Sequence, residues 1–367
     1  MKAISLVPGT TNISLDEVAE PIITRPDEIK MQVIRVGICG TDREEASGGR
    51  ADPPAGKEEL IIGHEMFGQV IEVGAGISSV KKGDYGVFTV RRGCGKCKAC
   101  TNNRSDMCFT GDYTERGIKA ADGFQSQFVV DTEEYFIPVP EEIKELGVLT
   151  EPMSVASKAI DEAMIVQGAR FKDFENPSEW FKGKKALVAG IGAIGILAAF
   201  ALRLRGAEVY GMDIVDRTTL RPQVLEQIGG KYVDGREVQV TDLDDYLGDM
   251  DFVFEAVGYA ELQIELIDAL GVNGIYVATG IPAGNRPITL DGADLMRQLV
   301  LKNQIVLGSV NASIDHYKMA VQDIHTCHKI WPEAISRIIT ERVPYTDFDK
   351  ALHHHSVDEI KVVVEWT

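Results

Sequence analysis

The stretch from Lys184 to Val215 constrains the fold more than any other part of this chain. Its order of residues predicts a buried strand, a glycine turn, an amphipathic helix that closes near Gly206, and a second buried strand that ends at Asp213. A G-x-G-x-x-G pattern between a buried strand and a helix is typical of a dinucleotide-binding βαβ unit. Further apolar strands alternate with helical segments such as AELQIELIDALG, which predicts an α/β fold with a doubly wound parallel sheet.

The glycine turn predicts how a cofactor would bind. Backbone N–H groups there can approach a pyrophosphate at the positive end of the helix, and a carboxylate at the end of the second strand can accept hydrogen bonds from the adenosine ribose. Asp213 would repel a 2′-phosphate, so NAD is preferred, while the nearby Arg217 leaves NADP possible. The expected cofactor-binding residues are Gly190, Gly192, Ala193, Ile194, Gly195, Asp213, Thr279, Gly280, Ser309 and Asn311.

The first 140 residues or so have a different pattern, in which short apolar runs alternate with Gly, Pro and Asp. This pattern is β-rich. The stretch from Asn176 to Gly183 is expected to lead into the coenzyme unit. We therefore expect a β-rich domain over 1–180 and 310–367, in which the C-terminal strand pairs with the N-terminal part, and a dinucleotide-binding domain over 181–309.

Four of the six cysteines gather in one short lobe, residues 91–110. Cys94, Cys97, Cys100 and Cys108 form C-x2-C-x2-C-x7-C, which suits a closed tetrahedral zinc site without an open position. Such a site is structural. An iron–sulfur cluster can share this spacing. Cys327 stands apart in a helical stretch and is expected to be a core thiol.

A second set of possible metal ligands is dispersed. Cys39 opens the motif Cys-Gly-Thr-Asp, His64 and Glu65 follow Gly63, and Glu151 precedes a proline. Together they offer the ligand types of a catalytic zinc that keeps a position for substrate or water. Taken singly, His64 is equally typical of a core histidine, and Asp42 and Glu65 of solvated turn carboxylates.

The charge balance excludes some partners. The formal net charge is −18, and such a field repels phosphate backbones and anionic bilayers, so neither nucleic acid nor a membrane is an expected partner. No apolar run approaches the roughly 20 residues of a membrane helix, and MKAISLVPGT is not a signal peptide, so a cytoplasmic location is expected. The run His353–His355 is more typical of a polar helix end than of a metal site.

These motifs, in this order, resemble the zinc-dependent medium-chain dehydrogenase/reductases over essentially the whole chain. Within that superfamily the similarity is greatest to the archaeal-type glucose (aldose) 1-dehydrogenases, through CGTDREEASGG, VRRGCGKC, ERGIKAADGF, LTEPMSVASKAI and LGSVNASIDHY. Val90 and Val155 differ from the sugar-binding Asn and Asp that some relatives have there.

The resemblance implies a GroES-like catalytic domain with an inserted Rossmann domain. It also implies two zinc ions: one held by Cys39, His64 and Glu151, with Glu65 as a ligand that exchanges with water, and one in the four-cysteine lobe. The implied reaction moves a hydride from C1 of an aldose such as glucose to NAD(P), giving the lactone. Expected substrate contacts are Thr41, Glu65, Glu115, Glu151 and Asn311.

Within this hypothesis, Thr41 accepts the hydroxyl proton and Asp42 fixes the ring of His64. A homo-oligomer, either a dimer or a tetramer, is expected. Two alternatives stay open at this point. One is a polyol, threonine or simple alcohol dehydrogenase on the same zinc scaffold, and the other is an inactive, zinc-stabilised binding protein.

Overall fold

The computed structural model describes residues 1–171, 179–282 and 287–367, so Asn176, Pro177 and Ser178 of the expected domain approach lie outside it. The chain forms two compact units. The first comprises Met1–Ser154, Asn311–His328 and Ile338–Thr367, and the second comprises Val155–Val310 and Lys329–Arg337. The first division falls inside helix α2 (Thr150–Phe171), earlier than the expected boundary at 180/181, because most of that helix belongs to the second unit. The assignment of catalytic roles to 1–180 and 310–367 remains a prediction.

The first unit is β-rich, as expected, and is built around β3 (Glu28–Gly37). This strand pairs antiparallel with three others, and its buried residues belong to the main hydrophobic core of the unit. One sheet has the order β11-β6-β5-β3-β19-β18 with β10 also on β3, a second has β2-β1-β4, and a third has β7-β8-β9. The strands are β1 (Lys2–Leu6), β2 (Ile13–Glu17), β4 (Leu60–Ile61), β5 (Glu65–Val73), β6 (Tyr85–Phe88), β7 (Arg91–Arg92), β8 (Thr114–Arg116), β9 (Ala120–Ala121), β10 (Phe128–Thr132), β11 (Phe136–Pro138), β18 (Ile339–Pro344) and β19 (Lys361–Glu365).

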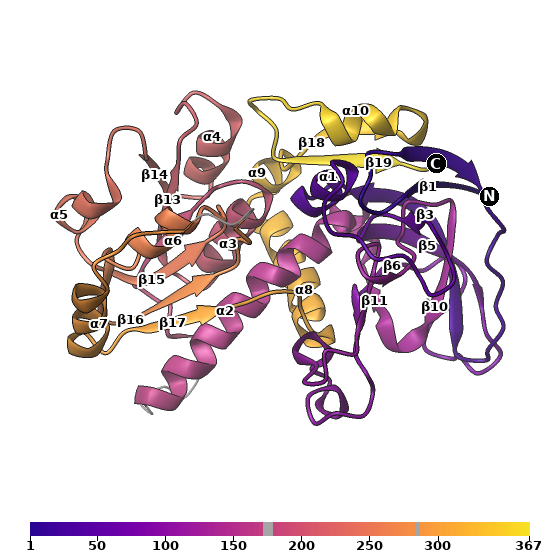
Figure 1. Ribbon diagram of the computed structural model, residues 1–367, viewed down its shortest axis with the longest axis horizontal. Coiled ribbons are helices and arrows are strands. Elements are labelled where there is room, and N and C mark those ends of the chain that lie inside the picture. Colours follow the sequence, from indigo (N-terminus) through magenta and orange to yellow (C-terminus); the bar gives the residue numbers. More distant parts are fainter. Residues whose placement is uncertain (172–178, 283–286) are drawn as a thin grey trace. The chain divides into compact units, whose positions relative to one another are not determined.

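The end of the chain returns to this unit. Strand β19 pairs antiparallel with β3, with Val363 opposite Gly37, and the yellow C-terminal segment lies beside the indigo N-terminal strands in Figure 1. The expected pairing of the C-terminal strand is therefore confirmed. The helices of this part are α1 (Gly40–Ala46), α8 (Ile314–Ile330) and α10 (Phe348–His353), and α8 buries Cys327 as expected.

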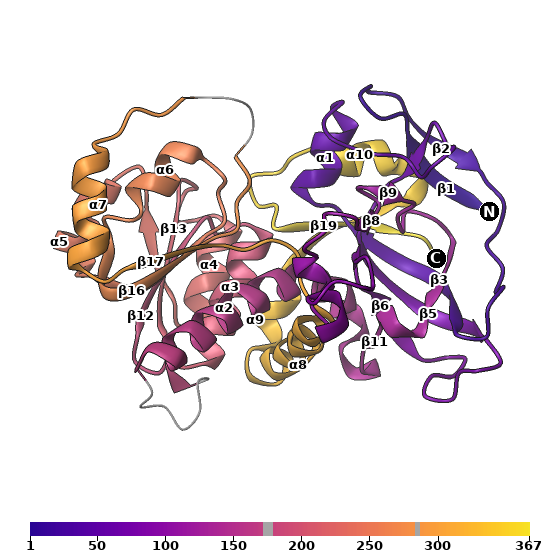
Figure 2. The same ribbon diagram turned by 60° about the horizontal axis from the view of Figure 1, so that its bottom comes forward.

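The second unit contains a six-stranded, all-parallel sheet in the order β14-β13-β12-β15-β16-β17. Helices α3 and α4 lie on one side of it and α5, α6 and α7 on the other (Figures 1 and 2), because right-handed crossovers change side where the strand order reverses. The elements are β12 (Lys185–Ala189), α3 (Ala193–Leu204), β13 (Glu208–Asp213), α4 (Leu220–Gln227), β14 (Lys231–Asp234), α5 (Leu243–Leu247), β15 (Met250–Glu255), α6 (Ala260–Glu265), β16 (Leu270–Ala278), α7 (Gly292–Leu301), β17 (Ile305–Gly308) and α9 (Pro332–Ser336). The expected doubly wound fold is confirmed.

One expected helix is shorter than its sequence pattern suggested. The apolar residues of AELQIELIDALG predicted a helix along the whole segment, but α6 ends at Glu265 and Leu270 already begins β16. Leu266, Ile267 and Leu270 instead enter the hydrophobic core of the sheet through a turn. No helix among the described residues is long and apolar enough to cross a membrane.

Candidate active site

Two adjacent strands bring together three of the dispersed ligand candidates. Strand β3 ends at Gly37, two residues before Cys39, which occupies the N-cap position of α1. Strand β5 begins at Glu65, directly after His64, and Glu65 lies opposite Gly37 in the antiparallel pairing. As a result, one ligand atom each from Cys39, His64 and Glu65 lie within 4.8 Å of one another. A thiol, an imidazole and a carboxylate at this separation suit zinc.

Gly37 makes this close approach possible. A Cβ atom added there would lie 2.0 Å from Glu65 Oε2, which is far inside van der Waals contact. Any other residue would therefore displace the carboxylate from its place beside Cys39 and His64. Gly37 is thus part of the site because it lacks a side chain and leaves room for the carboxylate of Glu65.

Asp42 organises the site from within α1. It is fully buried, and its Oδ2 accepts a hydrogen bond from the backbone N–H of Cys39 at 2.7 Å. Its Oδ1 lies 3.5 Å from His64 Nδ1. Burial opposes a charge on His64, but the carboxylate of Asp42 raises the pKa of His64 well above its ordinary value. The role of Asp42 in fixing the ring of His64 stays a prediction, in which Nε2 would be the ring nitrogen available to a metal.

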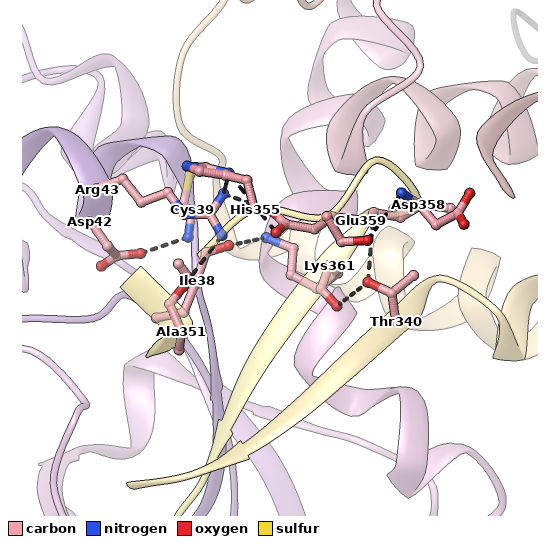
Figure 3. Close-up of polar contacts among 12 residues, drawn as sticks. Ile38, Cys39, Asp42, Arg43, Thr340, Ala351, His355, Asp358, Glu359 and Lys361 are labelled. Atoms are coloured by element: carbon pink, nitrogen blue, oxygen red, sulfur yellow. Dashed lines mark hydrogen bonds and ion pairs between the residues drawn. The ribbon is translucent and has the colours of Figure 1, made fainter. Parts of the chain in front are cut away.

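Lys361 is a member of the site that the motifs did not predict. Its ammonium is buried and donates to Glu65 Oε1 and Oε2 at 2.7 Å each. It also donates to the carbonyl of Ile38 at 3.0 Å (Figure 3). Burial lowers the pKa of Lys361, but Glu65 and Cys39 outweigh it and raise that pKa. The only signal in the sequence is a lysine at the start of the apolar run Ile360–Val364. The carboxylate of Glu65 is therefore shared with a cation of the chain itself.

A second contact with the C-terminal segment holds α1 in place. Arg43 Nη1 donates to Glu359 Oε1 at 2.7 Å, and Arg43 Nη2 donates to the carbonyl of Ala351 at 3.3 Å, as Figure 3 shows. The same guanidinium lies 3.1 Å from His355 Nδ1. The histidine run begins at His353, the last residue of α10, which confirms the expected polar helix end. Among the described residues, none of the three histidines belongs to a group that could hold a metal.

The remaining predicted residues of this site lie near it without joining the ligand group. Glu151 is buried at the start of α2, where burial, opposed by His64 and reinforced by Glu65, raises its pKa to about 7. Thr41 is half-buried in the first turn of α1. Glu45, which no motif marks, is also buried, and its burial and the nearby Asp42 raise the pKa of its carboxyl to about 9. Nothing in the local sequence distinguishes Glu45 from its exposed neighbour Glu44.

The four-cysteine lobe also has the geometry of a metal site. Its four sulfurs lie within 4.8 Å of one another, with Cys97 Sγ at 3.5 Å and Cys94 Sγ at 3.9 Å from Cys100 Sγ. Four thiolates at about 2.3 Å from a tetrahedral zinc would lie about 3.8 Å apart. The lobe therefore fits zinc with no position left for a substrate.

A separate polar group involves two of the predicted sugar contacts. Asn311 Nδ2 donates to Glu115 Oε1 at 2.6 Å, and Arg91 donates to the same oxygen through Nη2 at 2.9 Å and Nε at 3.1 Å. Glu115 is buried in β8, and Asn311 has a left-handed backbone with φ of 63°. The structure thus joins Glu115 with Asn311, 196 positions away.

The glycine turn has the expected setting between β12 and α3. A Cβ added to Gly195 would lie 1.8 Å from the carbonyl oxygen of Gly190, so the helix can approach the turn only with glycine there. Gly192 is the N-cap of α3, and Ala193 and Ile194 begin the helix. Asp213 ends β13, where its carboxylate accepts from Ile191 N at 3.1 Å and Ile214 N at 2.7 Å.

Three other predicted cofactor residues follow the later strands of the same sheet. Thr279 and Gly280 come after β16, and Ser309 comes after β17 with a buried hydroxyl that has no hydrogen-bond partner in the described chain. Because the carboxyl ends of parallel strands share one edge, these residues face the side of the sheet where dinucleotides bind. Glu255, which the sequence analysis missed, ends β15 and accepts from the backbone of Val257 and Gly258 at 2.7 and 2.6 Å. Asn311 belongs to the first unit.

The chain matches two family models. Residues 25–141 match the alcohol dehydrogenase GroES-like domain, and residues 144–366 match the glucose dehydrogenase C-terminus. Among curated relatives, a glucose 1-dehydrogenase of Methanocella arvoryzae is 33% identical over 100% of this chain and 99% of its own length. A glucose 1-dehydrogenase of Thermoproteus tenax is 32% identical with the same coverage.

A solved structure is also similar over the whole length. Glucose dehydrogenase from Haloferax mediterranei, in complex with NADP, Zn and gluconolactone, superposes with a TM-score of 0.89 at 30% identity, covering 100% of this chain and 99% of that one. That enzyme binds zinc, NADP and a sugar lactone.

Proposed function

Because the chain belongs to the zinc-dependent medium-chain dehydrogenase/reductases with a glucose dehydrogenase C-terminus, we propose that it oxidises C1 of an aldose such as glucose with NAD(P)⁺, giving the aldonolactone, NAD(P)H and a proton. The observation that carries the proposal is that two groups of polar side chains occur in the same unit. Cys39, His64 and Glu65 offer a mixed metal site, and Glu115 with Asn311 offers polar groups for a sugar. Simple alcohols would not need the second group.

Cys39 and His64, with Glu151 and with Glu65 as the exchangeable ligand, would hold the catalytic zinc. When bound, zinc would polarise the substrate hydroxyl and make its proton easier to lose. Asp42, whose Oδ1 lies 3.5 Å from His64 Nδ1, would orient the imidazole, and its Oδ2 accepts a hydrogen bond from the backbone N–H of Cys39 at the N-cap of α1. Thr41, two residues from Cys39, would accept the hydroxyl proton and pass it on. The buried Lys361 ammonium is paired with the Glu65 carboxylate through both of its oxygens.

Glu115 and Asn311 would recognise the sugar. The hydrogen bond from Asn311 and those from Arg91 all end on Glu115 Oε1. No described residue donates to Oε2, so this oxygen can accept from a sugar hydroxyl. Glu65 and Glu151 would contact the substrate on the metal side.

We propose NAD as the preferred dinucleotide. The residues of the glycine turn would hold the pyrophosphate, and Thr279, Gly280, Ser309 and Asn311 would contact the rest of the cofactor. Bound NAD(P)⁺ would accept the hydride. Asp213 would repel a 2′-phosphate, and the candidate Arg217 is engaged by Glu226 at 2.8 Å and by the carbonyl of Tyr232 at 3.1 Å.

The cofactor preference has a direct test. The unmodified protein should have the higher kcat/KM with NAD, and Asp213→Ser combined with Ile214→Arg should move the preference towards NADP. Ile214 is 69% exposed, so arginine there can reach a phosphate without repacking. If the unmodified protein has the higher kcat/KM with NADP, the dinucleotide in the complex of the Haloferax relative, the role given to Asp213 is wrong.

We also propose a cytoplasmic homo-oligomer that binds neither nucleic acid nor membrane. Strand β17 is an edge of the parallel sheet, and apolar side chains on it and on α7 are exposed. These are Met296, Val300, Leu301 and Val306, with exposed fractions of 57%, 68%, 72% and 45%. Such a surface suits a second copy. Light scattering of the purified protein measures the assembly directly.

The experiment that tests the function is a panel of aldoses, polyols and simple alcohols, run with NAD and with NADP and followed by NAD(P)H absorbance. Aldoses should give the highest kcat/KM. Higher kcat/KM values with polyols, threonine or simple alcohols would identify the chain as a dehydrogenase of that substrate on the same zinc scaffold. Zinc bound at one site only, without dinucleotide binding, would identify an inactive binding protein.

A further inference from the structure

Arg91 connects the four-cysteine lobe with the carboxylate that is proposed to recognise the sugar. It lies in β7, three residues before Cys94, and faces Glu115 of β8 in the antiparallel pairing. Its side chain is only 9% exposed and that of Glu115 only 11%. A buried guanidinium must have its N–H groups satisfied by fixed partners.

The donors of Arg91 are divided between two partners. Nε and Nη2 donate to Glu115 Oε1 at 3.1 and 2.9 Å, and Nη1 donates to the backbone carbonyl of Asp106 at 2.6 Å. Asp106 lies inside the lobe, two residues before Cys108. The guanidinium also stacks on the ring of Tyr113, 4.0 Å from its centroid. The position of the guanidinium is therefore set on one side by the lobe backbone.

We propose that Arg91 is a positioning residue through which the order of the four-cysteine lobe sets the affinity for the substrate. The identity of that substrate, an aldose, rests on the function proposed above. When the lobe is closed, the carbonyl of Asp106 accepts from Nη1 of Arg91. Nε and Nη2 of the same guanidinium then hold Oε1 of Glu115, so that Oε2 faces the substrate. When the lobe opens, the carbonyl of Asp106 moves away, and the guanidinium of Arg91 loses the contact that fixes its position.

Arginine suits this task and lysine does not. The planar guanidinium presents several donors in a fixed geometry, so it can hold a carbonyl and a carboxylate at once, whereas an ammonium is a single point charge on a flexible stem. Arg91→Lys keeps the charge but cannot keep both contacts. Arg92→Lys is a matched control, because Arg92 is the next residue of β7 and is bound by other groups, the carbonyl of Thr89 and the carboxylate of Asp131, each at 2.6 Å.

The first measurement is steady-state kinetics on the zinc-loaded protein. Arg91→Lys should raise KM for the aldose about tenfold, the size expected for a weakened charge-assisted contact, with kcat and KM for NAD within about twofold of the original. Arg92→Lys should leave KM for the aldose within about twofold. An unchanged KM in Arg91→Lys, or an equal rise in both variants, overturns the proposal.

The second measurement combines Arg91→Lys with Cys97→Ser, which opens the lobe. If the lobe acts through Arg91, Cys97→Ser should raise KM for the aldose in the original background but add little to Arg91→Lys. Independent effects that multiply in the double variant would show that the lobe acts by another route, and would overturn the proposal.

A third measurement does not depend on any substrate. Hydrogen exchange should become faster in Cys97→Ser at the amide of Glu115, which donates to the carbonyl of Lys119 at 2.8 Å, and should not become still faster when Arg91→Lys is added. Exchange that Cys97→Ser leaves unchanged overturns the coupling. If exchange responds but the original protein oxidises no aldose, the coupling stands and the proposed function fails.

Discussion

The lobe and the Cys39–His64–Glu65 group are both candidate zinc sites, but the chain assembles them in opposite ways. The lobe takes all its ligands from residues 94–108, and its four cysteines are half-exposed. The other group joins Cys39 with His64 and Glu65 across two paired strands and adds Lys361, 296 positions beyond Glu65. A local loop can close around a metal before the domain has folded, whereas the dispersed group exists only after β3, β5 and β19 have paired.

The electrostatic environments of the two groups also differ. The thiols of the lobe have mainly backbone N–H groups and one another as neighbours. The dispersed group lies among buried ionisable side chains, those of Asp42, Glu45, Glu151 and Lys361, and burial raises the pKa of Glu45 to about 9 and that of Glu151 to about 7. Four thiolates alone saturate a zinc ion, while a mixed set tuned by nearby charges leaves it reactive. The lobe would therefore contribute stability and the dispersed group chemistry, and each experiment below can contradict one of these two roles.

The largest effect is expected at Cys39. Cys39→Ser should lower kcat/KM by roughly a thousandfold, because a catalytic metal contributes several kcal/mol to transition-state stabilisation. The melting temperature should change little, since the N-cap hydrogen bond from the Cys39 N–H to Asp42 uses the backbone. Absorbance of NAD(P)H, zinc content and a thermal melt measure this. A variant with more than a tenth of the original activity would remove Cys39 from the chemistry.

The next effect concerns the buried pair of Lys361 and Glu65. Lys361→Met leaves the Glu65 carboxylate buried without its cation, and breaking such a pair typically costs about 3–5 kcal/mol. Urea unfolding of the metal-free protein measures the loss. The matched control is Lys361→Met combined with Glu65→Leu, which removes both charges and should recover most of the stability. A loss that persists in the double variant would show that packing, and not the unpaired charge, causes it.

The third effect tests the lobe. Cys97→Ser should remove one zinc ion per chain and lower the melting temperature by about 5 °C, equivalent to roughly 2 kcal/mol, while kcat remains near the original value. Cys327→Ala is the control for zinc content, because Cys327 is buried in α8 outside both groups. If Cys97→Ser still holds two zinc ions and has the same melting temperature as the original protein, the structural role assigned to the lobe is wrong.

The same contrast explains what the sequence could predict. The four cysteines and the glycine turn lie within short motifs whose chemistry depends on neighbours along the chain, so the lobe, the βαβ unit and the family were predictable. Lys361 and Arg91 were not, because each acts on a residue that only strand pairing brings near it. The roles given to Thr41, Glu115, Glu151 and Asn311 remain predictions. The prediction that the helix continues through Leu270 was wrong, because apolar residues at helical spacing also occur in a turn whose side chains pack into the core of a sheet.

The smallest effect is a difference in thiol reactivity within the metal-free lobe. A side-chain hydrogen bond with Thr110, at 3.3 Å, and backbone contacts lower the pKa of the Cys108 thiol to about 6, while burial raises the pKa of Cys100 to about 12. The thiolate is the reactive form, so alkylation of Cys108 should increase as the pH rises through 6 and then level off, with Cys100 modified last at pH 7.5. Iodoacetamide treatment after chelation, read by mass spectrometry, measures the order. Thr110→Val should move the Cys108 midpoint to higher pH because it removes the hydrogen bond that favours the thiolate. Zinc should protect all four cysteines together, and if it protects only some of them, the lobe does not form the closed four-thiolate site on which the comparison rests.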